Sequence, residues 1–226
     1  ETLQPMAERY AAAGIASFSI DYFLTSSERH GWPKNVQDVA CAVRQIKAHA
    51  ADLKVNVDRM AIGGTSAGGH LASLVGLMGA QNAVLDRECG DAGSYDHRVG
   101  LVVDYFGATD LTLMAQPGAG ERPQAAMMLG TSFEEDEALW NLASPVHHVS
   151  GDDPAFVIAH GTEDVAMPIE HSEVLYESLQ DAGVESWFVR VEGAGHSFHG
   201  QPIFNDQARC VIDPVLRDHL LGELAP

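Results

Sequence analysis

The sequence contains few basic residues and no long apolar run. Lys and Arg together number 13, against 32 Asp and Glu, which gives a formal net charge of −19 over 226 residues. A surface this acidic repels nucleic-acid phosphates and anionic lipid headgroups, so we expect neither nucleic acid nor a membrane as a partner. No apolar stretch reaches the ~20 residues that span a bilayer, and no signal-peptide pattern follows Glu1. These absences predict a cytoplasmic protein, or a secreted or periplasmic one if an export signal was lost upstream.

Cysteine is also scarce, with three residues at Cys41, Cys89 and Cys210. An odd number of widely spaced cysteines is typical of neither a disulfide framework nor a metal site. We expect buried, reduced thiols, with a Cys89–Cys210 disulfide as the alternative. The histidines lie beside no cluster of cysteines or carboxylates that would complete a metal site, so the sequence predicts no metal and no other cofactor.

The composition that remains is typical of a packed globule, with 46% hydrophobic and 20% charged residues. The length suits a single domain over residues 1–226. Apolar strand-like segments alternate with amphipathic helix-like segments, and this order predicts an α/β fold with a mostly parallel sheet covered by helices on both faces. The expected helices span residues 3–13, 35–51, 67–78, 168–182 and 205–221, and the expected strands span residues 15–22, 59–64, 100–106, 155–160 and 186–191.

Residues 111–150 do not fit this alternation. They include Met114, Met127, Met128 and Trp140, and Met-rich, aromatic stretches are typical of adaptable apolar pockets. The segment is too short for a large lid domain. We therefore expect a small cap-like insertion that lines a pocket.

The most informative motif is Gly-x-Ser-x-Gly at residues 64–68, between a short apolar strand and an almost wholly apolar helix. In such a sharp strand-to-helix turn the serine adopts a strained backbone conformation, and small neighbours avoid clashes. The Ser66 hydroxyl would stand above the helix N-terminus as a nucleophile. The Ala67 amide would point at a developing oxyanion, supported by the helix dipole. The glycines do not indicate nucleotide binding, because the phosphate-loop Lys-Ser/Thr pair and the GxGxxG spacing are both absent.

A nucleophilic serine needs a base and a carboxylate that orients the base, and here the carboxylate should follow the serine and precede the histidine. Asp164 follows the expected strand 155–160 and is the predicted acid, with Glu163 as the second choice. The alternative is that these acids only cap the next helix. His196 follows the last expected strand in a glycine-rich loop and is the predicted base. We expect His160 to order the loop that carries the acid.

These motifs resemble those of a known family. Residues 64–72, Gly-Thr-Ser-Ala-Gly-Gly-His-Leu-Ala, are similar to the nucleophile elbow of α/β-hydrolase esterases. The nearest group contains bacterial carboxylesterases and acetyl-xylan and feruloyl esterase-like enzymes, near the hormone-sensitive-lipase branch. The resemblance implies an α/β-hydrolase fold with Ser66, Asp164 and His196 as the catalytic triad and Ala67 as an oxyanion amide. Further landmarks of the family match residues 21–22, 58–59, 104–107 and 144–145.

Two features depart from the family pattern. Phe23 stands where the family usually has an arginine, which removes an ion pair. The family's His-Gly-Gly loop, which supplies a second oxyanion donor, is not found; residues 30–32 are similar in composition but follow the wrong strand. Loss of one such donor typically costs about 10²–10³-fold in turnover. Because that loop would precede the first helix, and Glu1 is not a methionine, we expect N-terminal strands of the sheet to be missing from this chain.

The resemblance and the motif order together predict a serine carboxylesterase that acts on short-chain acyl or small aromatic esters through an acyl-enzyme intermediate. Two alternatives stay open: an amide hydrolase of the aryl-formamidase kind, and a catalytically dead hydrolase-fold protein that binds a small molecule. The expected partner is a small ester substrate. Dimerisation through an outer strand or helix is common in this fold, so a homodimer stays open by analogy.

Overall fold

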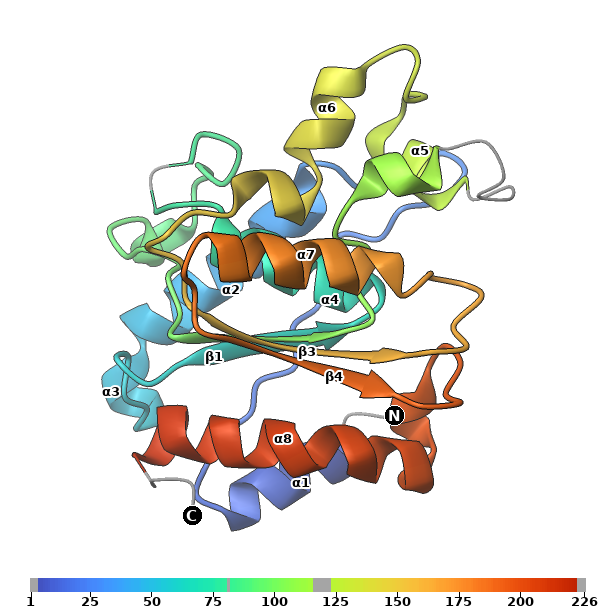
Figure 1. Cartoon of the computed structure of the whole chain (residues 1–226). Helices are drawn as coiled ribbons and strands as arrows, with labels where there is room; N and C mark the ends of the chain where they lie inside the picture. Colours follow the sequence, from blue (N-terminus) through green and yellow to red (C-terminus); the bar gives the residue numbers. More distant parts are fainter. Residues whose placement is uncertain (1–3, 81, 116–122, 223–226) are drawn as a thin grey trace.

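Four parallel strands form the central sheet of the computed structural model, which describes residues 4–80, 82–115 and 123–222 (Figure 1). The strands pair in the order β1-β2-β3-β4, and all pairings are parallel. The carboxyl ends of the strands therefore meet at one edge, where the side chains that follow them can share a site. The strands are β1 (Ala61–Thr65), β2 (Leu101–Tyr105), β3 (Ala155–Gly161) and β4 (Ser186–Val191).

Helices cover both faces of this sheet. Phe156 and Ile158 of β3 pack into the core formed with α2, α4 and α7, while Val157 and Ala159 of the same strand pack against α8. This burial of both faces confirms the α/β architecture expected from the sequence pattern. The helices on one face are α2 (Lys34–Ala48), α4 (Ala67–Leu77) and α7 (Glu170–Asp181), and those on the other are α1 (Gln4–Ala12) and α8 (Pro202–Leu221) (Figure 1).

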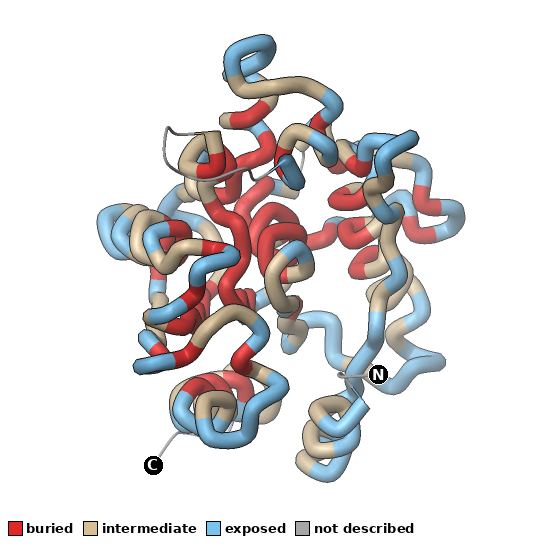
Figure 2. The backbone as a smooth tube through the Cα atoms, turned by 90° about the vertical axis from the view of Figure 1, so that its right-hand side faces the viewer, coloured by how far each residue is buried: buried red, intermediate tan, exposed pale blue. Residues whose placement is uncertain are grey.

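The helix α4 is held tightly on the sheet. Leu71, Leu74 and Val75 are each at most 2% exposed, and burying such a side chain contributes about 1.5–3 kcal/mol. A Cβ on Gly76 would collide with Val102, so the glycine lets α4 lie close to β2. Figure 2 shows the buried backbone concentrated at the centre of the molecule, while α1 contributes no buried residue. The helix that begins beside Ser66 is thus more firmly packed than α1.

The described part of residues 111–150 forms short helices outside the layer of α4 and α7 (Figure 1). They share a separate apolar cluster, in which Met114, Leu129 and Trp140 are buried together with Met167. Trp32 packs against both this cluster and the main core. The cap-like role of this segment stays a prediction. Its helices are η2 (Leu111–Met114), α5 (Gln124–Leu129), α6 (Glu137–Leu142) and η3 (Pro145–His148).

One expected strand is not formed. Residues 15–22 are described, but they run as an irregular segment that pairs with no described strand. A strand needs the backbone groups of a neighbour, which local apolar content cannot supply. The prediction of a strand over residues 15–22 is therefore wrong. The other expected elements lie within a few residues of their predicted positions, except that the expected helix 35–51 breaks at His49 into α2 and α3 (Ala50–Leu53).

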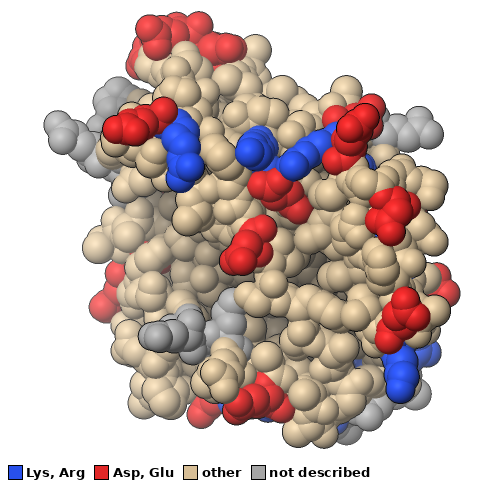
Figure 3. Space-filling view, turned by 180° about the vertical axis from the view of Figure 1, so that it is seen from behind, with Lys and Arg blue, Asp and Glu red and all other residues tan. Residues whose placement is uncertain are grey.

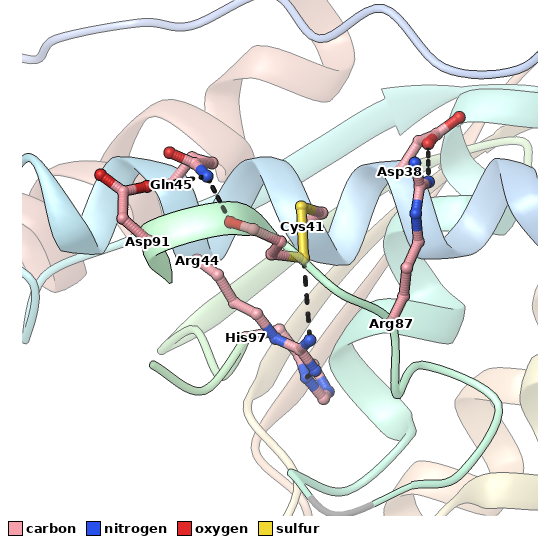
Figure 4. Close-up of a disulfide and its surroundings, with 8 residues drawn as sticks. Asp38, Cys41, Arg44, Gln45, Arg87, Asp91 and His97 are labelled. Atoms are coloured by element: carbon pink, nitrogen blue, oxygen red, sulfur yellow. Dashed lines mark hydrogen bonds and ion pairs between the residues drawn. A yellow bond between two sulfur atoms is a disulfide. The ribbon is translucent and has the colours of Figure 1, made fainter. Parts of the chain in front are cut away.

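A disulfide joins Cys41 on α2 to Cys89 in the segment that precedes β2 (Figure 4). The two Cα atoms are 5.6 Å apart, and the Gln45 side chain donates a hydrogen bond to the Cys89 carbonyl at 2.6 Å. Cys210 is free and exposed on α8, on the opposite face of the sheet. The expected buried, reduced thiols and the alternative Cys89–Cys210 bridge are both wrong, because spacing along the chain does not reveal that residues 82–98 pack against α2.

Several basic side chains form ion pairs with acidic ones. Arg87 pairs with Asp38, and Lys47 pairs with Asp96. Figure 3 shows basic side chains beside acidic ones on the rear face, with further acidic groups standing apart. Because acids outnumber bases by 32 to 13, the excess charge stays negative. In the described ranges, no helix is both long and apolar enough to cross a membrane.

Candidate active site

Ser66 lies at the junction of β1 and α4 in a conformation that a non-glycine residue rarely adopts, with φ 53° and ψ −117°. Two backbone hydrogen bonds fix this turn: the Ser66 amide donates to the Tyr105 carbonyl at 2.9 Å, and the His70 amide donates to the Ser66 carbonyl at 3.0 Å. A Cβ on Gly64 would collide with the Gly68 backbone, so glycine is required there. The turn therefore has the geometry of a nucleophile elbow, as the motif predicts.

Ala67 is the first residue of α4. Amides in the first turn of a helix have no intrahelical acceptor, and the helix dipole favours negative charge near them. The position suits the predicted oxyanion role of the Ala67 amide, which stays a prediction. The similar-looking turn at residues 30–32 is engaged elsewhere, because the Trp32 amide donates to the Met128 carbonyl at 3.1 Å and His30 Nδ1 lies 2.9 Å from the Met127 carbonyl.

His196 joins the serine to a carboxylate. Its Nε2 lies 3.1 Å from Ser66 Oγ, and its Nδ1 lies 2.6 Å from Asp164 Oδ2. A carboxylate accepts only, so Nδ1 carries the hydrogen and Nε2 is free to accept the proton of the serine hydroxyl. The imidazole packs edge to face on Phe106, with 4.7 Å between the ring centroids. The three residues that the sequence predicts as a triad are thus brought together from three separate loops.

Asp164 is held by a dense set of donors. Its Oδ1 accepts hydrogen bonds from the amides of Ala166 at 2.9 Å and Met167 at 2.8 Å, while Oδ2 faces His196 and, at 3.4 Å, His160 Nε2. Burial alone would raise the pKa of the carboxyl. The hydrogen bonds from His160, His196 and the Met167 amide outweigh it and hold the pKa of Asp164 well below its usual range. The carboxylate is therefore charged at neutral pH.

Glu163, the second choice for the acid, is exposed. Asp164 is the neighbour whose side chain is fully buried and bonded to the histidine. The alternative that Asp164 only caps a helix does not describe its contacts, since it lies six residues ahead of α7 and bonds to His196.

Several side chains around the site were not identified from the sequence as functional. Phe106 supports the His196 ring, and its only sequence signal is its place in the landmark at residues 104–107. His70 donates from Nδ1 to the Ala108 carbonyl at 2.7 Å, which ties α4 to the segment after β2. Burial lowers the pKa of His70 to about 4, so the imidazole is neutral at pH 7. Across the part of the chain that the structure describes, no group of three or more His, Cys, Asp or Glu could hold a metal ion.

A serine on a strand-to-helix turn, a carboxylate after a later strand and a histidine after the next one define the α/β-hydrolase class. The parallel sheet with helices on both faces is the fold of that class. Within it, the chain belongs to the BD-FAE family, whose model matches residues 1–179. The matched range contains Ser66 and Asp164, and His196 lies beyond it.

Two curated relatives are esterases of Mycobacterium tuberculosis. Esterase LipC is 28% identical over 196 residues, which are 84% of this chain and 47% of LipC. Esterase LipQ is 28% identical over 196 residues, which are 86% of this chain and 45% of LipQ. The chain thus spans about half the length of the curated relatives it matches.

Solved structures with the same fold are also esterases. A truncated carbohydrate esterase from gut microbiota is 28% identical with a TM-score of 0.73, and the match covers 84% of this chain and 70% of that one. Esterase Est2 of Thermogutta terrifontis is 25% identical with a TM-score of 0.79, and the match covers 100% of this chain and 77% of that one. The α/β-hydrolase fold expected from the sequence resemblance is therefore confirmed.

Proposed function

We propose that this chain hydrolyses carboxylic esters, with Ser66 as nucleophile, His196 as base and Asp164 as the group that orients the base. The observation that carries this proposal is the unbroken row of hydrogen bonds from Ser66 Oγ through both nitrogens of His196 to Asp164 Oδ2. The esterase names of the relatives LipC and LipQ support the same reaction.

In the proposed reaction Ser66 Oγ attacks the ester carbonyl while His196 Nε2 takes the hydroxyl proton. Asp164 stays ionised and stabilises the imidazolium that forms. The Ala67 amide, at the start of α4, stabilises the negative oxygen of the tetrahedral intermediate. His196 then gives its proton to the leaving alcohol, which leaves an acyl group on Ser66. Water, activated by the same histidine, releases the acid and restores the serine.

The substrate we propose is a neutral ester with a short acyl or small aromatic group. The cluster of Met114, Leu129, Trp140 and Met167 is compact and apolar, and Met167 directly joins it to the loop that carries Asp164. The net charge of −19 disfavours anionic substrates. The Thermogutta terrifontis esterase has been solved with propionate and with butyrate bound, which supports short acyl groups in this fold.

Nitrophenyl esters of increasing acyl length, from acetate to palmitate, test the proposal. We expect the highest kcat/KM on the acetyl or butyryl ester and a loss of activity of about 10⁶-fold in Ser66→Ala. Ser19→Ala, which removes an exposed serine outside the site, is the matched control and should keep wild-type activity. Activity that survives in Ser66→Ala would contradict the mechanism, and a maximum at long chains would contradict the proposed preference for short acyl groups. Turnover of an N-formyl aryl amide above that of the acetyl ester would favour the amide hydrolase instead.

A further inference from the structure

A second buried imidazole close to the triad belongs to His160, at the end of β3. It is fully buried. Its Nε2 lies 2.8 Å from the Met167 carbonyl and 3.4 Å from Asp164 Oδ2, while its Nδ1 lies 2.6 Å from Ser172 Oγ on α7. His160 therefore contacts the acid, the far end of the loop that carries it, and the next helix.

These partners fix where the hydrogen of the His160 ring sits. A backbone carbonyl and a carboxylate oxygen can only accept, so Nε2 must carry a hydrogen and donate it to both. Ser172 Oγ can donate as well as accept, so in the neutral ring its hydroxyl donates to Nδ1. The result is a directed chain of hydrogen bonds from Ser172 through His160 to Asp164.

We propose that His160 and Ser172 are positioning residues of the site. They hold Asp164 in hydrogen-bond contact with His196 and set how strongly the negative charge of Asp164 acts on His196. This inference rests on the proposed ester hydrolysis. Both Asp164 oxygens are then committed: Oδ1 to the amides of Ala166 and Met167, and Oδ2 to the two histidines. The carboxylate cannot rotate without losing several of these bonds. The loop needs such support because Val165, next to the acid, is 87% exposed.

The hydrogen bond from His160 also competes with His196 for the same oxygen. Removing it leaves more negative charge on Oδ2 for His196, which favours the protonated imidazole. The base would then lose its proton only at higher pH. The other titratable groups that face these residues are His199 beside His196 and Asp104 beside His160, and neither changes in the variants below.

A purely steric role for His160 is the competing explanation, because its ring also packs edge to face on Phe106, at 6.3 Å between centroids. Two substitutions separate the roles. His160→Gln keeps an N–H donor near the position of Nε2, whereas His160→Leu has a similar bulk and no donor. Ser172→Ala leaves the ring in place and removes only the donor to Nδ1.

The experiment measures kcat, KM and the pH profile of kcat/KM for these variants on a nitrophenyl ester. For His160→Leu we expect kcat to fall about 10²-fold at similar KM, since small misplacements of catalytic groups cost this much. We also expect the acidic limb of the pH profile of kcat/KM to move to higher pH by about half a pH unit. His160→Gln should recover most of kcat, and Ser172→Ala should shift the limb in the same direction by less. An unchanged acid limb in His160→Leu, or a His160→Gln as impaired as the leucine variant, would overturn the proposal.

Imidazole ¹H–¹⁵N NMR of the wild-type protein tests the same chain without a substrate. We expect a hydrogen on His160 Nε2 at neutral pH, and a neutral ring with its hydrogen on Nδ1 would overturn the proposal. If His160→Leu does not fold, the kinetics of His160→Gln and Ser172→Ala and this spectrum still test whether His160 positions Asp164. Failure of the proposed function is distinguishable, because the wild-type protein would then hydrolyse no ester, whatever the His160 tautomer.

Discussion

Two buried carboxylates lie near the carboxyl edge of the sheet, and their environments shift them in opposite directions. Asp104 belongs to β2 and Asp164 follows β3, and neither carboxylate is exposed. Burial raises the pKa of Asp104 to about 6, against the opposing effects of His160, the Gly107 amide and Ser73. The pKa of Asp164 is instead held well below its usual range. The same residue type at neighbouring strand ends thus has a raised pKa in one case and a lowered pKa in the other.

The difference follows from the donors around each carboxylate. Asp104 accepts one amide hydrogen bond, from Gly107 at 2.9 Å, and a longer one from the Ser73 hydroxyl at 3.3 Å. Asp164 accepts two short amide bonds and faces two histidines. Desolvation favours the neutral form and hydrogen bonds favour the charged form, so the number of donors decides which prevails. Environments that separate the pKa values of two acids in this way leave them in different protonation states at the same pH.

Replacing Asp164, which accepts more hydrogen bonds, should have the largest effect on kcat. Asp164→Asn keeps the shape of the side chain but can present an N–H to His196, which favours the wrong imidazole tautomer. We expect kcat on a nitrophenyl ester to fall about 10⁴-fold. Asp104→Asn is the matched control, because it makes the same change at the other buried carboxylate. An Asp164→Asn variant that keeps more than a tenth of wild-type kcat would contradict the assignment of the acid.

Replacing Asp104, which accepts fewer hydrogen bonds than Asp164, should change the stability of the protein and its pH dependence. The folded pKa of Asp104, about 6, lies above the usual value of about 3.9, so the contribution of Asp104 to the free energy of unfolding falls as pH rises from about 4 through 6. Asp104→Asn removes this loss. We expect its free energy of unfolding, relative to wild type, to grow by up to about 3 kcal/mol between pH 4 and pH 7.5.

Urea unfolding of both proteins at pH 4, 5.5 and 7.5 measures this difference. A difference that stays constant over this range would show that Asp104 titrates normally, and burial would then not separate the pKa values of the two acids.

The sequence predicts the parts of this fold that local pattern controls. The strand at residues 186–191 is found with those bounds, because an apolar β-branched and aromatic run stands there between turns. Residues 15–22 have a similar local pattern, yet they form no strand, since pairing depends on a partner that the pattern does not contain. The sequence does not predict the Cys41–Cys89 bridge for the same reason, because the bridge depends on a contact between distant segments.

In the candidate site, too, sequence patterns predict some residues, while only tertiary packing reveals others. Motif and strand order predict Ser66, His196 and the loop that carries Asp164. In the structure Ser66 and Asp164 both lie within hydrogen-bond distance of His196. The sequence makes Asp164 the first choice for the acid and Glu163 the second, and burial distinguishes the two in the structure. Ser172 could not be found from the sequence, because a serine inside an amphipathic helix gives no signal until the helix is packed against His160.

The proposed reaction requires Ser66 to be a nucleophile activated by His196 and Asp164. Labelling with a fluorophosphonate, followed by mass spectrometry of the peptides, tests it most directly, because the reagent reacts with activated serines whatever the natural substrate. We expect a single adduct on Ser66, none in Ser66→Ala, and slow labelling in Asp164→Asn. A folded wild-type protein that takes up no label, or takes it up at another serine, would show that Ser66 is not an activated nucleophile.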